Sequence, residues 1–371
     1  MTDPLPLAQA LLRCASVTPA DAGAQTVLAD ALRATGFTVT HLRYGEIENL
    51  FAEIGGDGPH FCFAGHTDVV PPGAMWDGDP FGGEVRDGVL HGRGACDMKG
   101  AIAAFVAAVT DYKGLGSISL LITGDEEGPA TDGTVRVLEW MAEHGHIPDL
   151  CLVGEPTNPQ RLGEVIKIGR RGSLNAGITV HGTQGHAAYP QRADNPVHRL
   201  VRALSALTEA KLDAVGEGAG SEWFELSTLQ VTSIDVGNPA ANVIPGSAAA
   251  RLNIRFNDRH TGAALEAWLR ATLAQHAERF ELDVAVSGEA FLTAPGPLVD
   301  RLVAAVAKAT GVTPRLDTGG GTSDARFIAR HCPVAEFGLV GATMHQANER
   351  VPVEELRHLA RVYGAVLAEF A

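Results

Sequence analysis

Short apolar runs alternate with longer amphipathic stretches through the first third of the chain. Residues 61–64 form a fully apolar run, as is usual for a strand buried on both faces. Apolar residues at helical spacing predict a helical stretch over 5–35. The elements predicted next are a strand at 89–90, a helix at 97–112, a strand at 117–123, a helix at 134–143 and a strand at 150–153. This alternation is typical of an α/β domain with a largely parallel sheet.

The pattern changes after Gly172. Segments 174–180, 227–235 and 248–256 alternate apolar and polar residues, as strands with one exposed face do. Helices are predicted at 195–207 and 263–280 and a last strand at 282–287, which completes the β-α-β-β-α-β order of a ferredoxin-like module. The α/β pattern then resumes, with a predicted helix at 298–310 and an apolar run at 333–337. We therefore predict a discontinuous α/β domain at 1–172 and 288–371 that carries an inserted α+β domain at 173–287.

The amino-acid composition argues against some classes of binding partner. The 371 residues include 44 acidic and 29 basic side chains, a formal charge of −15, which argues against nucleic acid and against anionic membranes as partners. The five cysteines lack CxxC spacing, so neither a disulfide framework nor a thiolate zinc site is predicted. The first residues contain no basic segment followed by a long apolar run, so we expect no signal peptide and no transmembrane segment. The expected location is the cytoplasm, a reducing compartment.

Acids and histidines follow five of the predicted strands, where α/β sheets bind their ligands. These residues are His66 with nearby Asp68, Asp97, the pair Glu126 and Glu127, Glu155, and His345. Imidazole nitrogen and carboxylate oxygen suit Zn²⁺, and two adjacent cations need a bridging carboxylate. The set predicts a two-metal hydrolytic site in which Asp68 holds the ring tautomer of His66. One glutamate of the adjacent pair is expected to bind metal while the other acts as general base.

Four sequence blocks resemble the signature segments of the M20 metallopeptidase family. The blocks are AGHTDVVPPG (64–73), GRGACDMKG (92–100), TGDEEG (123–128) and GEP (154–156). The resemblance implies two Zn²⁺ per subunit, replaceable by Co²⁺, with Glu126 as the general acid/base and a cis peptide bond after Asp97. The ligands it implies are His66 and Glu155 for one ion, Glu127 and His345 for the other, and Asp97 as the bridge between them.

Later blocks, among them HGTQGHAAYPQRADNPVHR (181–199) and TGGGTSDARFIAR (318–330), resemble one branch of that family. This branch hydrolyses N-succinyl-LL-2,6-diaminopimelate to succinate and LL-2,6-diaminopimelate in bacterial lysine synthesis. The resemblance implies a homodimer in which the inserted domain mediates dimerisation and closes over the site. It also implies that His186 stabilises the oxyanion in the partner subunit's site. The residues implied to bind the small succinylated substrate are Arg170, Ser173, Tyr189, Asn242, Arg255, Gly321 and Thr322.

The residues alone leave alternatives open. Glu126 and Glu127 are also compatible with a solvated turn, and Arg170 with a solvated basic pair. Acetylornithine deacetylase, aminoacylase and carboxypeptidase activities belong to the same family, and a non-catalytic metal- or peptide-binding relative is a remoter alternative. A carboxylate-bearing acyl group needs the charges of Arg170 and Arg255, whereas an acetyl group leaves both without a partner. This difference favours a succinylated substrate.

Overall fold

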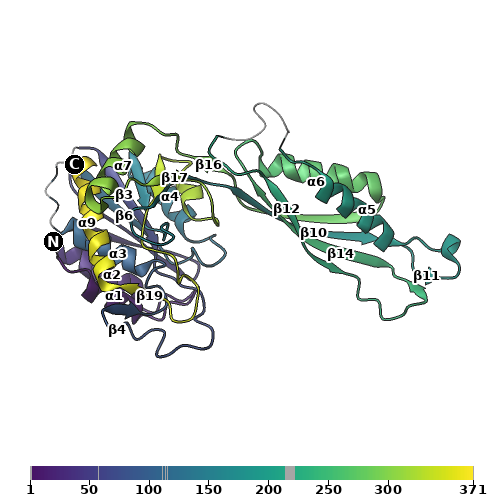
Figure 1. Cartoon of the computed structure of the whole chain (residues 1–371), viewed down its shortest axis with the longest axis horizontal. Coiled ribbons are helices and arrows are strands. Elements are labelled where there is room, and N and C mark those ends of the chain that lie inside the picture. Colours follow the sequence, from purple (N-terminus) through teal and green to yellow (C-terminus); the bar gives the residue numbers. More distant parts are fainter. Residues whose placement is uncertain are drawn as a thin grey trace. The chain divides into compact units, whose positions relative to one another are not determined.

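A computed structural model describes residues 2–56, 58–110, 112, 114, 116–213 and 222–370. The chain forms two compact units (Figure 1). Unit 1 comprises Met1–Gly169, Thr293–Asp317 and Ser323–Ala371, and unit 2 comprises Arg170–Leu292 and Thr318–Thr322. The units begin and end a few residues from the boundaries expected at 172/173 and 287/288, and the short segment 318–322 groups with unit 2.

A mixed eight-stranded sheet, of order β1-β2-β6-β3-β7-β18-β8-β17, forms the centre of unit 1. Its strands are β1 (Thr38–Tyr44), β2 (Ile47–Ile54), β3 (His60–His66), β6 (Ser117–Thr123), β7 (Leu150–Val153), β8 (Val165–Lys167), β17 (Arg315–Asp317) and β18 (Val334–Glu336). Four neighbours, β6, β3, β7 and β18, run parallel, whereas β1 and β2 are antiparallel at one edge. The prediction of a largely parallel sheet in an α/β domain is confirmed.

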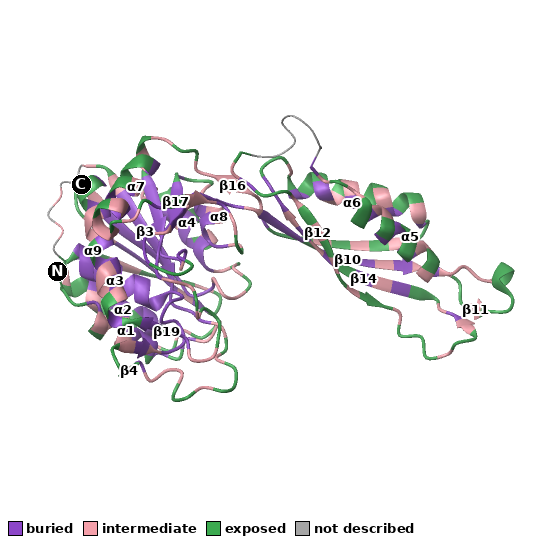
Figure 2. Ribbon diagram, in the orientation of Figure 1, coloured by how far each residue is buried: buried purple, intermediate pink, exposed green. Residues whose placement is uncertain are grey.

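Helices cover both faces of this sheet. They are α1 (Leu5–Leu12), α2 (Ala24–Ala34), α3 (Lys99–Val109), α4 (Thr134–His144), α7 (Pro297–Thr310), α8 (Ala325–Ile328) and α9 (Val353–Phe370). On one face Phe63 of β3 stacks on Phe105 of α3, with ring centroids 4.2 Å apart, and Tyr363 of α9 meets both rings edge-on. Phe51 of β2 points to the opposite face and contacts Trp140 of α4. Helix α3 is buried along its whole length (Figure 2).

One predicted helix of unit 1 needs correction. The predicted helical stretch 5–35 is two helices, α1 and α2. Pro19 has no amide hydrogen for a helical bond, and Gly23 adopts a left-handed φ of 88° before α2 begins. Strands β1 and β2 and helix α9 were not predicted at all. By contrast, the strand predicted at 117–123 and the helix predicted at 134–143 correspond to β6 and α4.

The strand predicted at 89–90 lies outside the main sheet. It is β5 (Val89–His91), the middle strand of a small sheet with β4 (Glu84–Arg86) and β19 (Arg350–Pro352). The prediction that Asp97 follows a strand of the α/β sheet is therefore wrong, because Asp97 lies two residues before α3. The peptide bond after Asp97 is cis, as expected. Pairing of β5 with β19 places the segment after His91 beside the segment before Arg350.

Unit 2 has an antiparallel four-stranded sheet of order β12-β14-β10-β15. Its main elements are β10 (Gly172–His181), α5 (Pro196–Glu209), β12 (Thr228–Asp235), β14 (Ser247–Phe256), α6 (Gly262–His276) and β15 (Phe280–Gly288). This is the predicted β-α-β-β-α-β order, although α6 ends at His276 and residue 280 already belongs to β15. The smaller elements are β9 (Gly169–Arg170), paired with β16 (Phe291–Leu292), β11 (Gly185–His186), paired with β13 (Val243–Ile244), and the 3₁₀ turn η1 (Pro190–Arg192).

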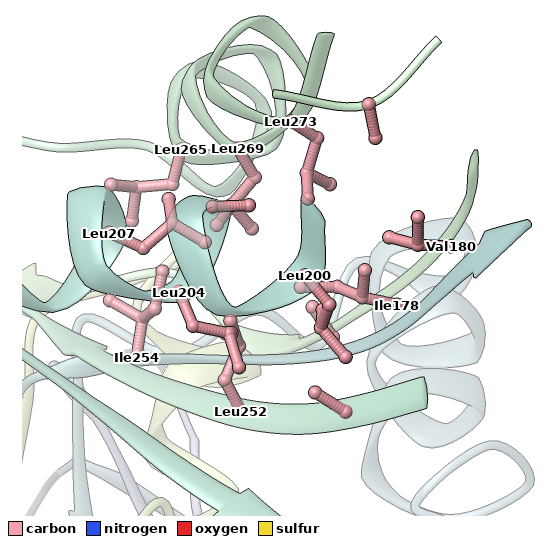
Figure 3. Close-up of a cluster of buried hydrophobic side chains, with 14 of the residues drawn as sticks. Ile178, Val180, Leu200, Leu204, Leu207, Leu252, Ile254, Leu265, Leu269 and Leu273 are labelled. Carbon is pink, nitrogen blue, oxygen red and sulfur yellow. The ribbon is translucent and has the colours of Figure 1, made fainter. Parts of the chain in front are cut away.

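The core of unit 2 lies between this sheet and its two helices (Figure 3). Alternate residues of β10, such as Leu174 and Ile178, face Leu204 of α5 and Leu269 of α6, and all four are buried. The amphipathic pattern of the strands thus matches one covered and one open face of the sheet. Among the described residues of the whole chain, no helix has the length and apolar character needed to cross a bilayer.

Candidate metal centre and active site

Three neighbouring parallel strands deliver an imidazole and several acids to one edge of the main sheet. His66 is the last residue of β3, and Glu155 follows β7 by two residues. Glu126 and Glu127 follow β6, which ends at Thr123. Because β6, β3 and β7 are adjacent and parallel, their carboxyl ends place these side chains beside one another.

Asp97 lies between two histidine side chains. Its Oδ1 atom is 3.2 Å from His66 Nε2, and its Oδ2 atom is 3.1 Å from His345 Nε2. On one side Glu155 Oε1 is 3.8 Å from His66 Nε2. On the other side Glu127 Oε1 is 2.8 Å from His345 Nε2. The five side chains therefore form two imidazole–carboxylate pairs that share the Asp97 carboxylate.

The chemistry of this donor set fits divalent cations. His66, Asp97 and Glu127 bring three ligand atoms within 4.8 Å of one another, and so do His66, Glu126 and Glu155. Imidazole nitrogen and carboxylate oxygen suit Zn²⁺, and also Co²⁺ and Mn²⁺. A central carboxylate with one oxygen toward each imidazole is suited to bridging two cations.

The same contacts shift the pKa values of these groups. Hydrogen bonds to Asp97 and Glu127 raise the pKa of His345 to about 10. Burial acts to lower the pKa of His66, but its contact with Asp97 outweighs burial and the pKa is raised. Burial acts to raise the pKa of Asp97, but the hydrogen bonds from His345 and His66 outweigh it and lower that pKa. A divalent cation would therefore compete with protons for these ligands.

Asp68 holds the segment that carries the two glutamates. Its Oδ1 atom accepts a hydrogen bond from the Glu126 amide at 3.2 Å, and its Oδ2 atom accepts one from the Glu127 amide at 3.0 Å. The Nδ1 atom of His66 donates to the backbone carbonyl of Asp68 at 2.8 Å, while the nearer carboxylate oxygen is 3.7 Å away. The structure thus assigns the ring contact to the carbonyl rather than to the expected carboxylate, because the carboxylate binds the two amides.

Glu126 has the electrostatic character of a proton-transferring group. Burial and the neighbouring charge of Glu155 raise its pKa well above the usual value for a glutamic acid. A carboxyl group transfers protons most effectively when its pKa lies near the working pH. The backbone of Glu126 is also fixed by Asp68. Glu126 is therefore the candidate general acid/base on chemical grounds.

Five of the predicted substrate-binding residues lie at one end of β10, within unit 2. We call Arg170, Ser173, Arg255, Gly321 and Thr322 the Arg170 cluster. Arg170 Nη1 donates to the carbonyl of Gly321 at 3.1 Å. Ser173 and Arg255 face each other across β10 and β14. Burial and the nearby charge of Arg171 lower the pKa of Arg255. Guanidinium and hydroxyl groups are donors of the kind that bind carboxylates in proteins.

The remaining predicted residues, His186, Tyr189 and Asn242, lie at the other end of β10; we call them the His186 cluster. The Ala187 amide donates to the carbonyl of Asn242 at 2.8 Å, and the rings of His186 and Tyr189 are 5.6 Å apart. All three residues are exposed. The ten residues of β10 span roughly 33 Å between the two clusters. One copy of unit 2 therefore does not bring the His186 cluster to the Arg170 cluster.

A buried ion pair that the sequence did not predict adjoins the candidate centre. Arg93 Nη1 lies 2.7 Å from Glu349 Oε2, and the two side chains are 2% and 0% exposed. Arg93 lies in the block 92–100, and Glu349 follows the implied ligand His345 by four residues, but charged loop residues are usually solvated. Their burial follows from the pairing of β5 with β19, a long-range contact that no local pattern indicated.

The amino-acid sequence of this chain is similar to those of known proteins. The family described as Peptidase family M20/M25/M40 matches residues 62–369. A protein of Acidiphilium cryptum named succinyl-diaminopimelate desuccinylase is 62% identical, and the match covers 98% of each chain. A protein of the same name from Granulibacter bethesdensis is 64% identical, over 99% of this chain and 98% of that protein.

Solved structures share the fold at much lower identity. The M20 family metallo-carboxypeptidase Sso-CP2 from Sulfolobus solfataricus has a TM-score of 0.80 at 16% identity and covers 100% of this chain and 99% of its own. A dinuclear metal binding peptidase from the M20 family of Bacillus subtilis has a TM-score of 0.73 at 16% identity, over 99% of this chain and 96% of its own. At 16% sequence identity, these similarities show a shared fold only.

Proposed function

Because the chain belongs to peptidase family M20/M25/M40, we propose that it is a metal-dependent amidohydrolase acting on N-succinyl-LL-2,6-diaminopimelate. The products are succinate and LL-2,6-diaminopimelate, so the reaction serves lysine and diaminopimelate biosynthesis. The observation that carries the proposed chemistry is the Asp97 carboxylate between two imidazole–carboxylate pairs. The proposed substrate rests on the names of relatives that are 62% and 64% identical over nearly the whole chain.

In this proposal the resident cofactor is a pair of Zn²⁺ ions, which Co²⁺ replaces. Such ions supply Lewis acidity toward a carbonyl oxygen and a nucleophilic water at neutral pH. The ligands would be His66 and Glu155 for one ion, Glu127 and His345 for the other, and the shared Asp97. The support is the donor chemistry and the close approach of the ligand atoms.

Glu126 then acts as the general acid/base. Its carboxylate takes a proton from the attacking water and delivers that proton to the leaving amine nitrogen. Burial and the charge of Glu155 raise the pKa of Glu126, which favours uptake of a proton by its carboxylate. Asp68 contributes by fixing the backbone amides of Glu126 and Glu127, so that one side chain faces the water while the other remains a ligand.

The Arg170 cluster binds the succinyl carboxylate in this proposal. Arg170 and Arg255 supply planar, permanently charged forks, and Ser173 and Thr322 supply hydroxyl groups. An acetyl group has no charge to pair with these arginines, so acetylated amino acids should bind less well. This is the feature that separates the proposed activity from acetylornithine deacetylase and aminoacylase activities.

The His186 cluster acts in the partner subunit of a homodimer, with unit 2 as the dimerisation domain. His186 stabilises the oxyanion, and Tyr189 and Asn242 contact the substrate. Two observations support action in trans. The cluster is exposed, and the length of β10 separates it from the Arg170 cluster of its own chain.

The proposal also places the enzyme in the cytoplasm. All five cysteines are buried and none forms a disulfide. Unpaired thiols are usual in proteins of reducing compartments.

A substrate panel tests the proposed activity. Protein stripped with EDTA and refilled with Zn²⁺ is assayed for amide cleavage of N-succinyl-LL-2,6-diaminopimelate, N-acetylornithine and a dipeptide. We expect zinc-dependent turnover, with kcat/KM for the succinylated substrate at least about 100-fold above the others. Equal or better cleavage of the acetylated substrate would reject the proposed specificity, and metal-independent cleavage would reject the proposed chemistry.

Mixing two inactive variants tests action in trans. Glu126→Gln and His186→Ala are each expected to be nearly inactive as homodimers. After unfolding and refolding together, heterodimers should contain one site with both native residues and regain up to about one quarter of wild-type turnover, since half the dimers are mixed and each has one intact site. If the mixture stays as inactive as its components while size-exclusion chromatography detects heterodimers, His186 does not act in trans.

A further inference from the structure

Two segments that carry candidate metal ligands are joined by one buried side chain. Asp97 lies in the segment between β5 and α3, and His345 lies in the segment that leads into β19. Glu349 follows His345 by four residues and is completely buried. The Glu349 carboxylate accepts a hydrogen bond from the amide of Asp97. Glu349 therefore links the main chain that carries His345 to the main chain that carries Asp97.

The Glu349 carboxylate accepts five hydrogen bonds. Its Oε1 atom accepts from the Cys96 amide at 2.9 Å, the Asp97 amide at 3.2 Å and the Cys96 thiol at 3.3 Å. Its Oε2 atom accepts from the Gly94 amide at 3.0 Å and from Arg93 Nη1 at 2.7 Å. Three backbone amides of residues 94–97 are therefore directed at one carboxylate, which fixes the path of the chain up to Asp97.

Arg93 completes the connection. Its Nη2 atom lies 3.3 Å from the carbonyl oxygen of Pro72 and 3.5 Å from that of His345. A buried ion pair loses much of its Coulombic gain to desolvation, and an apolar pair of similar volume is often as stable. Stability alone therefore does not account for this pair, whereas the placement of the two segments does.

The backbone of the segment around His345 has a conformation that surrounding contacts must hold in place. His345 and Asn348 have positive φ values of 61° and 59°, a region that residues other than glycine rarely adopt. Such conformations persist only where the surroundings hold them. Here the Gly92 amide donates to the carbonyl of Glu349 at 3.0 Å, and the Asp77 amide donates to Asn348 Oδ1 at 2.8 Å.

We propose that Glu349, neutralised by Arg93, is a positioning residue that sets the separation of Asp97 and His345 and thereby the affinity of the centre for its second divalent cation. The inference rests on the proposed two-metal function. Glu349 acts through the Asp97 amide and through its own segment, and it contacts no ligand atom. Changes at supporting residues around metal ligands typically weaken metal affinity by about 10- to 100-fold.

The test uses Glu349→Gln in the full-length protein. The carboxamide keeps the size of the side chain but turns one acceptor into a donor, which then faces backbone amides or Arg93. The matched control is Asp213→Asn in unit 2. Asp213 is also a buried carboxylate, and it accepts hydrogen bonds from the Ser227 amide at 2.5 Å and from His260 at 2.8 Å. Both variants lose a charged acceptor, but only one adjoins the candidate centre.

EDTA-treated proteins are titrated with Co²⁺, and binding is followed by calorimetry and by visible d–d absorption. Wild type and Asp213→Asn should bind two Co²⁺ per subunit with the same affinities and spectra. Glu349→Gln should bind one Co²⁺ about 10- to 100-fold more weakly, with an altered absorption band. If folded Glu349→Gln, checked by far-UV circular dichroism, matches wild type in both readouts, the inference is overturned.

A second variant covers the case in which Glu349→Gln does not fold. Arg93→Lys keeps the positive charge beside Glu349 but loses the fork that reaches the carbonyls of Pro72 and His345. We expect weaker binding of one Co²⁺ in the same direction, and unchanged binding would overturn the inference. Wild-type protein that binds no divalent cation would instead overturn the proposed function, and this inference with it.

Discussion

The candidate metal ligands of unit 1 and the His186 cluster of unit 2 differ in how far the protein buries them. His66 and Asp97 are 1% and 5% exposed, and both lie within a network of short contacts. Tyr189 is 51% exposed, and the rest of the His186 cluster is exposed as well. Groups that bind cations at a fixed spacing gain from being preorganised. The His186 cluster is proposed to act in a partner subunit, and its exposure leaves it accessible to that subunit.

His345 qualifies this contrast within unit 1, because its side chain is 46% exposed although it contacts Asp97 and Glu127. The centre therefore has a buried side at His66 and an open side at His345. Substrate would approach from the open side. Substitutions in the buried and in the accessible groups should therefore have different consequences.

The largest effect is expected for Glu126→Gln. The carboxamide cannot take a proton from water, so turnover should fall by about 10²- to 10⁴-fold. Metal content, measured by atomic emission, should remain at the wild-type value. Glu139→Gln on the exposed side of α4 is the control and should retain full activity. Wild-type turnover in Glu126→Gln would refute the acid/base role.

A smaller and selective effect is expected for Arg255→Met. Loss of a charged hydrogen-bond donor to the succinyl carboxylate should lower kcat/KM for the succinylated substrate by about 10- to 100-fold. Cleavage of an acetylated analogue should hardly change. Arg251→Met, which alters an exposed position on the same strand, serves as control. An equal loss on both substrates would mean that Arg255 does not recognise the carboxylate.

Leu269→Ala should affect stability without affecting the centre. Leu269 is fully buried in the core of unit 2, so its truncation should cost about 2–5 kcal/mol in the free energy of unfolding. Urea denaturation measures the loss, and metal content in the absence of urea should stay normal. Val201→Ala, at a half-exposed position of α5, should change the free energy by less than about 0.5 kcal/mol. Loss of metal from folded Leu269→Ala would contradict the separation of the two roles.

Asp213→Asn should have the smallest effect, and one that depends on pH. Burial acts to raise the pKa of Asp213, but hydrogen bonds from Ser227 and His260 outweigh it and hold the pKa below its usual range. A carboxyl group with a lowered folded-state pKa stabilises the protein above its unfolded-state pKa, and this contribution is lost as pH falls through the folded-state value.

At pH 7 we therefore expect Asp213→Asn to be less stable than wild type by about 1–3 kcal/mol. Urea unfolding at a series of pH values should find this difference constant down to about pH 4 and shrinking below that. A difference that grows as the solution is acidified would contradict the assignment, because it would require a raised pKa at Asp213.

Local sequence pattern predicted the elements whose signal is local. The apolar run of β6 and the alternating strands of unit 2 were found because burial on one or two faces leaves a direct trace in the sequence. The break between α1 and α2 was missed although Pro19 and Gly23 mark it. Helix α9 was missed as well, although Leu356, Leu359 and Tyr363 recur at helical spacing and are buried.

The sequence by itself determined which chemical groups follow the buried strands: imidazoles and carboxylates without a thiolate partner, in an order that resembles a metallopeptidase family. Only the tertiary structure decided that Asp97 reaches the centre from the start of α3 rather than from a strand of the main sheet. It also decided that Glu349 and Arg93 are buried together beneath it. The physical reason is that periodicity reports burial along one element, whereas these contacts depend on the pairing of β5 with β19, segments that lie far apart in the chain.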